Sequence, residues 1–221
     1  MTKRQVLVRF LWVIIVFAIL LLPCAAPMPP WQVYAFVDGS FVLLPPSLPP
    51  ASFSPPPPVP LSPCLPPIPP DWHVTAVTLA DVTGDQRPEW LLLVWRPWRD
   101  WPIQRWSPVP SPIAGFHDAA GDSCHLILLD PRDGREIWAG SALPAPLLAV
   151  AVGDVDGDRQ DEVVTLEGDY ATGRAGPATH VDVWRWNGFG FVLDYRSPPG
   201  TFRHLRLTDG NDDGKLDILI R

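Results

Sequence analysis

The chain has 221 residues, of which 30 are proline and 11 tryptophan, with 17 basic and 24 acidic side chains and a formal net charge of −7. Because proline lacks the amide hydrogen and clashes with the preceding helical turn, this proline content excludes a mainly helical protein. The negative charge argues against a nucleic-acid partner, since binding to phosphates needs a basic face.

The N-terminus is predicted to carry an export signal. Lys3, Arg4 and Arg9 precede or open an apolar run over residues 10–22, and basic residues before an apolar core direct export. Residues 1–26 are predicted to be either a cleaved signal peptide or an uncleaved hydrophobic anchor helix in the membrane. The anchor is slightly favoured, because Pro27 would be a poor first residue of a mature chain. A lipid-modified Cys24 is a third alternative, and all three place the rest of the chain outside the cytoplasm, secreted or membrane-anchored.

Two short regions follow. Residues 27–44 are predicted to contain a β-hairpin, with strands from Gln32 to Phe36 and from Phe41 to Leu44 around an Asp-Gly turn. Residues 45–70 hold 14 prolines and no charge, which predicts an extended polyproline spacer. Residues 71–221 contain 23 of the 24 acids but only 14 of the 17 basic residues, so the acidity belongs to this last region.

One nine-residue acidic loop occurs three times in residues 71–221. Oxygen-bearing side chains recur at positions 1, 3, 5 and 9 of each copy: Asp81, Thr83, Asp85 and Glu89 in loop one; Asp154, Asp156, Asp158 and Glu162 in loop two; Asp209, Asn211, Asp213 and Asp217 in loop three. Position 7, occupied by Arg87, Gln160 and Lys215, would contribute its backbone carbonyl. Calcium takes six to eight such oxygen ligands, so each loop is a predicted calcium site. Tight Asp/Gly turns without metal are the alternative, which three copies in register disfavour.

The segments on both sides of the loops are short, rich in β-branched residues and bounded by glycine, as strands are. An EF-hand is excluded, because it needs flanking helices and a Glu at position 12. The predicted strand pairs run from Val74 to Leu79 and Trp90 to Trp95, from Leu147 to Gly153 and Glu162 to Leu166, and from Phe202 to Leu207 and Leu216 to Ile220.

These strand–loop–strand units resemble the FG-GAP and VCBS repeats of integrin-alpha-type β-propellers, most clearly from Val152 to Val163. The resemblance implies an all-β, propeller-like array of about three four-stranded blades with calcium between the first two strands, in a protein at or beyond the cell surface. The family usually has glycine at position 6, which Gly214 satisfies but Gln86 and Arg159 do not. With Thr83 as a further departure, loop one is expected to be the weakest site.

Each blade needs a second strand pair after its loop. The segments from Cys124 to Leu129 and Arg135 to Trp138 supply it in the first unit, and those from His180 to Trp186 and Phe191 to Tyr195 in the second. The third unit stops at Arg221, but the hairpin of residues 31–44 aligns without a gap on the second pair of the middle unit. The hairpin is therefore expected either to pair with the C-terminal strands or to pack independently on the first blade.

Three blades are too few for a ring, since propellers have four to eight. The chain would then be an open arc, form a six-bladed ring as a homodimer, or use its proline-rich segment to fill the gap.

Further candidates lie outside the loops. Trp95, Trp98, Trp101 and Trp106 alternate with arginines in an insertion of the first unit and would either bind a ligand or cover the blade edge. Cys64 and Cys124 would form a disulfide or remain free thiols.

No catalytic constellation emerges from the sequence. The predicted function is a non-catalytic, extracytoplasmic, calcium-binding module that mediates protein or glycan interaction at the cell surface. The alternatives are a structural component of a larger surface assembly and, on fold analogy alone, a propeller-based hydrolase or lyase.

Overall fold

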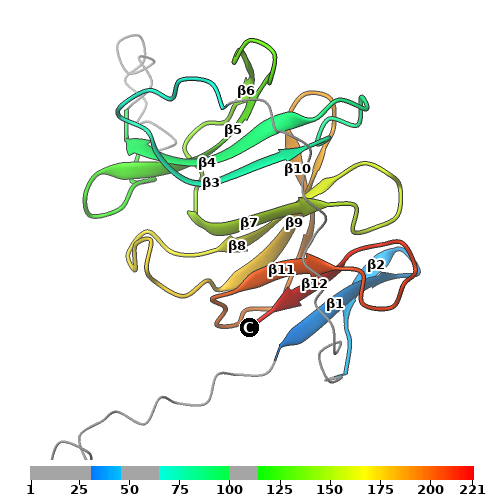
Figure 1. The fold of residues 1–221 in the computed structure, drawn as a ribbon. Coiled ribbons are helices and arrows are strands. Elements are labelled where there is room, and N and C mark those ends of the chain that lie inside the picture. The colour runs from blue at the N-terminus through cyan, green and yellow to red at the C-terminus, as the bar shows by residue number, and fades with distance from the viewer. Residues whose placement is uncertain (1–30, 46–64, 100–113) are drawn as a thin grey trace, which may run out of the picture.

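The computed structural model describes residues 31–45, 65–99 and 114–221, which form twelve strands in three antiparallel four-stranded sheets and no helix (Figure 1). The all-β prediction is thereby confirmed for this part of the chain. The predicted N-terminal helix of residues 1–26 and most of the proline-rich spacer lie outside the described residues. Within them, no helix has the length and apolar character of a membrane span.

The three sheets follow one another from top to bottom in Figure 1. The first sheet has the order β3 (His73–Ala80), β4 (Glu89–Pro97), β5 (Asp122–Leu129) and β6 (Glu136–Ala139). The second has the order β7 (Leu147–Gly153), β8 (Glu162–Glu167), β9 (His180–Trp186) and β10 (Phe191–Arg196). The third has the order β11 (Leu205–Thr208), β12 (Asp217–Ile220), β1 (Gln32–Val37) and β2 (Ser40–Leu43).

The third sheet joins the two ends of the described chain. Strand β1 pairs antiparallel with β12, with Gln32 opposite Ile220 and Tyr34 opposite Ile218. Of the two arrangements expected for the hairpin, the pairing with the C-terminal strands is the one that forms. The third sheet is therefore complete only when β1 and β2, from one end of the described chain, pair with β11 and β12 from the other.

Aromatic packing supports the equivalence between the hairpin and the outer half of the second sheet. The rings of Phe36 and Phe41 lie 5.1 Å apart, and Phe41 contacts Tyr195 at 5.2 Å. The rings of Trp186 and Phe191, at the aligned positions, lie 5.4 Å apart, and both contact Trp138 of the first sheet. In both places an aromatic pair packs on a ring from the preceding sheet.

The core lies between the sheets. On β8, Val163 packs in the cluster shared with the first sheet, while Val164 and Leu166 pack in the cluster shared with the third. Because successive strand residues point to opposite faces, a strand covered on both sides needs an unbroken apolar run. The outer face of the first sheet is also covered, since Ile68 and Trp72 pack against Leu92 and Val94.

Strand β11 begins later than predicted. The segment from Phe202 to Leu207 was expected to be a single strand, but β11 begins at Leu205, and Phe202 instead forms an isolated bridge with Ala178. The Phe202 side chain is buried in the core between the second and third sheets. Its apolar character therefore reflects core packing outside the regular sheet.

Candidate metal sites in the acidic loops

The three acidic loops share one hydrogen-bond frame. The carboxylate at position 9 accepts the backbone N–H of position 2: Glu89 from Val82, Glu162 from Val155, and Asp217 from Gly210. The carboxylate at position 1 accepts the N–H of position 6, and the carboxylate at position 5 accepts the N–H of position 7. The recurrence of acids in the sequence thus corresponds to a recurring fold of the backbone around their oxygens.

Positions 4 and 6 take left-handed backbone conformations in all three loops. Position 4 is Gly84 (φ 74°), Gly157 (φ 89°) and Asp212 (φ 57°), and position 6 is Gln86 (φ 68°), Arg159 (φ 75°) and Gly214 (φ 84°). The absence of glycine at position 6 in loops one and two therefore does not change the loop shape. It places a residue with a β-carbon where glycine would be less strained.

Loop two has the arrangement that best fits a cation. One carboxylate oxygen of each of Asp154, Asp156 and Glu162 lies within 4.8 Å of the other two. The Glu162 side chain belongs to a residue only 1% exposed; its Oε2 accepts the Val155 amide at 2.9 Å, whereas its buried Oε1 has no hydrogen-bond partner.

Burial, followed by the neighbouring aspartates, raises the pKa of Glu162 to about 8. A buried carboxylate among like charges, with one oxygen unpaired, is a group that a bound cation would stabilise.

Loop one gathers a similar set. Oxygens of Asp81, Asp85 and Glu89 lie within 4.8 Å of one another, and the buried Asp81 Oδ1 has no hydrogen-bond partner. Glu89 is more fully engaged than Glu162, because the Thr83 hydroxyl donates to its Oε1 at 3.1 Å. Burial raises the pKa of Glu89 above its usual value, against the lowering effect of the bonds from Thr83. Loop one therefore fits a cation, although Thr83 is directed towards Glu89.

Loop three does not gather its carboxylates in the same way. Asp213 Oδ2 accepts the Asn211 side-chain amide at 3.1 Å and lies 3.6 Å from Lys215 Nζ. Among the described residues, the carboxylate groups close enough to share a metal are those of loops one and two. Position 3 of loop three is Asn211, so this loop has one carboxylate fewer at its ligand positions than loop two. The expectation that loop one is the weakest site stays a prediction.

Two cavities open beside the better-formed loops. A cavity of about 630 Å³ lies next to Thr83, Asp85 and Glu89, with Arg87, Arg132 and Arg135 also in its wall. A second, of about 320 Å³, lies next to Asp156, Asp158 and Glu162. Its remaining lining comes from β9, β10 and the β1–β2 hairpin, namely Phe36, Gly39, Ser40, Phe41, Val183, Arg185, Asp194 and Tyr195. Sequence reasoning missed the hairpin residues; their aromatic alignment with Trp186 and Phe191 was the available signal.

The tryptophan insertion is only partly within the described residues. Trp95 is 1% exposed, and its ring packs against Tyr170 and under the Arg174 guanidinium, so it lies in the interior rather than on a binding surface. Trp98 contacts the His117 ring at 5.6 Å, whereas Trp101 and Trp106 lie outside the described residues. The predicted tryptophan surface is therefore not assembled by the part of the chain that the structure describes.

The predicted disulfide also involves a residue outside that part, since Cys64 is not described. Cys124 is a buried free cysteine, and its sulfur accepts the Leu147 amide at 3.4 Å. Burial raises the pKa of Cys124 to about 12, so this thiol remains protonated and unreactive at neutral pH.

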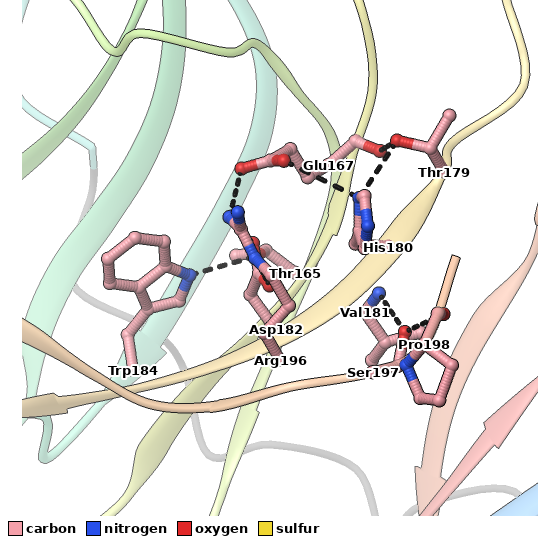
Figure 2. Close-up of polar contacts among 10 residues, drawn as sticks. All are labelled: Thr165, Glu167, Thr179, His180, Val181, Asp182, Trp184, Arg196, Ser197 and Pro198. Carbon is pink, nitrogen blue, oxygen red and sulfur yellow. Dashed lines mark hydrogen bonds and ion pairs between the residues drawn. The ribbon is translucent and has the colours of Figure 1, made fainter. Parts of the chain in front are cut away.

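A second polar cluster lies on β8, β9 and β10 (Figure 2). Arg196 donates to both carboxylate oxygens of the fully buried Asp182, at 2.9 and 3.0 Å, and also to Glu167. His180 contacts the Thr179 hydroxyl at 3.1 Å and lies 3.7 Å from Glu167, while the Trp184 indole donates to Thr165. These groups satisfy one another, which is the arrangement of a structural network.

Comparison with known proteins assigns no family: no protein-family model, curated protein or solved structure matches this chain.

Proposed function

We propose that this chain is a non-catalytic, calcium-binding, propeller-like module that mediates protein or glycan interaction outside the cytoplasm, tethered or exported by its N-terminal segment. The observation that carries the calcium part of the proposal is the buried, unpartnered Oε1 of Glu162 beside Asp154 and Asp156. Calcium prefers hard oxygen donors, and loop two has a carboxylate at each of positions 1, 3, 5 and 9.

A bound cation would also relieve repulsion within the loop. The carboxylates of Asp154, Asp156 and Asp158 each disfavour ionisation of Glu162. When like charges are crowded at low solvent exposure, an ion of opposite charge stabilises all of them together. Calcium would therefore stiffen the turn between β7 and β8, and in the same way the turn between β3 and β4.

The propeller-like arrangement is supported by three sheets of equal strand number and by a third sheet shared between the two chain ends. Such sharing is one way to hold an array of sheets together without leaving its terminal strands unpaired. Closure into a six-bladed ring by a second copy would require the first sheet to expose its outer face, which Ile68 and Trp72 now cover. An open arc is therefore favoured over the homodimeric ring.

A binding role is favoured over an enzymatic one by the state of the polar side chains. His125 is 5% exposed and bonded to Ser123 and Gly140, and His180 belongs to the internal network of Figure 2. In contrast, the carboxylates of loops one and two line open cavities. Accessible side chains beside a candidate ion suit recognition of an oxygen-rich partner.

The test is the melting temperature of the detergent-solubilised full chain with calcium chloride, magnesium chloride or EDTA. Calcium at a hundred times its Kd should add roughly 2.7 kcal/mol of stability, and magnesium should add less, because it needs near-ideal octahedral geometry. Asp156→Asn should remove the part of the calcium shift that loop two supplies, whereas Asp213→Asn in loop three should leave that part in place. Equal melting temperatures in calcium and EDTA would contradict the proposal.

A further inference from the structure

The cavity beside loop two joins the start of the chain to its middle. Asp156, Asp158 and Glu162 of loop two form one wall, and Phe36, Ser40 and Phe41 of the β1–β2 hairpin form another. Arg185, Asp194 and Tyr195 of β9 and β10 complete the lining. With a volume of about 320 Å³, the cavity is at the lower end of the size range of small-ligand pockets.

The ion proposed for loop two would face this cavity. Loop two would supply oxygens from five residues, namely the side chains of Asp154, Asp156, Asp158 and Glu162 and the backbone carbonyl of Gln160. Calcium takes six to eight oxygen ligands. Three of the four carboxylate residues line the cavity, and Glu162, at 1% exposed, keeps Oε1 free of any hydrogen bond. The loop therefore leaves at least one coordination position unassigned, and an oxygen ligand in the cavity would be near enough to supply it.

Another part of the cavity lining is aromatic. Phe41 lies 5.1 Å from Phe36 and 5.2 Å from Tyr195, so the three rings support one another. The hairpin is held in place from loop three, because Lys215 Nζ donates to the Phe36 carbonyl at 3.0 Å. A fixed aromatic surface binds the apolar C–H face of a flat ligand at low cost in conformational entropy.

The polar groups in the cavity suit hydroxyls. Arg185 and Asp194 form an ion pair at 2.7 Å whose side chains remain 46% and 30% exposed, and they offer a donor and an acceptor next to the aromatic wall. The acids of the lining disfavour a phosphorylated or carboxylated ligand. A neutral molecule that combines adjacent hydroxyls with an apolar face meets all of these conditions.

We propose that the cavity between loop two and the β1–β2 hairpin binds a saccharide, which places a pair of neighbouring hydroxyls on the loop-two cation and packs its apolar face on Phe41 and Tyr195. This assignment rests on the proposed calcium site and names its partner class. It places glycan recognition at the hairpin, away from the tryptophan insertion.

The experiment uses the detergent-solubilised full chain and ligand-observed NMR with a panel of D-mannose, D-galactose, D-glucose, L-fucose and N-acetyl-D-glucosamine. At least one sugar should bind in calcium and be released by EDTA. Phe41→Ala should weaken binding about tenfold, equivalent to about 1.4 kcal/mol, while leaving the calcium-induced melting shift in place. Phe189→Ala is the matched control, because Phe189 is 88% exposed and does not line the cavity.

A second variant tests the assignment if Phe41→Ala fails to fold. Ser40→Arg places a large side chain at an exposed residue of the same lining and should abolish sugar binding without disturbing the core. Trp98→Ala should leave the affinity for the sugar unchanged.

The outcomes separate the two proposals. A calcium-induced melting shift without binding of any sugar in the panel would overturn the saccharide site and leave the calcium module standing. Binding of an arginine-rich peptide to the metal-free cavity, in place of sugars, would also overturn it. Absence of the calcium shift would overturn the calcium module together with the inference that rests on it.

Discussion

Gln160 of loop two donates its side-chain amide to the carbonyl of Val82 in loop one, with an Nε2–O distance of 3.1 Å. Lys215 at the same position of loop three lies against Gly157 of loop two, 3.0 Å from where a β-carbon on that glycine would stand. The backbone repeats the relationship, because Leu216 N donates to the Asp154 carbonyl at 2.9 Å. Position 7, predicted only as a source of a backbone carbonyl, thus links loop two to loop one and loop three to loop two.

Substitution of Gly157, which lies against Lys215, should lower the free energy of unfolding by more than its left-handed backbone conformation alone explains. Gly157→Ala introduces a β-carbon at φ 89°, where left-handed geometry costs about 1–2 kcal/mol, and also displaces Lys215. Gly188→Ala is the matched control, since it has φ 90° but no neighbour within 4 Å. Urea denaturation should show a larger loss for Gly157→Ala, and Lys215→Ala should remove the excess. Equal losses at the two glycines would show that the link carries no energy.

Loop two should be stabilised by glycine at position 6. Arg159 has φ 75°, so Arg159→Gly should relieve left-handed strain and raise the free energy of unfolding by up to about 1 kcal/mol, net of the entropy that glycine adds to the unfolded chain. Arg159→Ala keeps the strain and serves as the control in chemical denaturation. A glycine variant no more stable than the alanine variant would argue against strain at this position.

The ion pair between Arg196 and Asp182 should matter far more than the neighbouring pair of Arg185 and Asp194. Arg196→Met leaves the 0% exposed Asp182 carboxylate without its cation and should cost about 3 kcal/mol, somewhat reduced because Arg196 is itself part-exposed. Arg185→Met, in a pair that is 46% and 30% exposed, should cost no more than about 1 kcal/mol. Replacing Asp182 with Val in the Arg196→Met background should recover part of the loss, and no recovery would mean that the buried charge is not its cause.

His125 should destabilise the protein in acid. Burial, reinforced by Arg96, lowers the pKa of His125 to about 4 from an ordinary value of 6.5, and the neutral ring is satisfied by donating to Gly140 and accepting from Ser123. The unfolded chain takes up the proton first, so this contribution is complete above pH 6.5 and is lost as the pH falls towards 4, by up to about 3 kcal/mol.

The measurement is the free energy of unfolding at pH 7 and at pH 4.5 for the wild-type chain, His125→Gln and the surface control His73→Gln. The drop on acidification should be smaller in His125→Gln than in the wild type and unchanged in His73→Gln. An undiminished drop in His125→Gln would assign acid sensitivity to other groups.

The sequence by itself determined the strands, the turns and the loop frame, because each depends on residues close together in the chain. A short run rich in β-branched residues predicted β8, alternating apolar residues around Asn187-Gly188 predicted the β9–β10 hairpin, and the spaced acids predicted the folded loops. The pairing of β1 with β12 was only one of two alternatives, since both hairpin placements satisfy the same local pattern.

Tertiary structure decided the features that join distant residues. Lys215 of loop three donates to the Phe36 carbonyl and lies 3.6 Å from Asp213, so it joins loop three to the hairpin. Trp95 lies in the core because the second sheet covers it. The loop-two cavity exists only because the hairpin at the start of the chain packs beside strands more than a hundred residues later. The spacing of the acids along the chain determines which loop oxygens lie close together. Which side chains from other parts of the chain contact those loops depends on how the sheets pack.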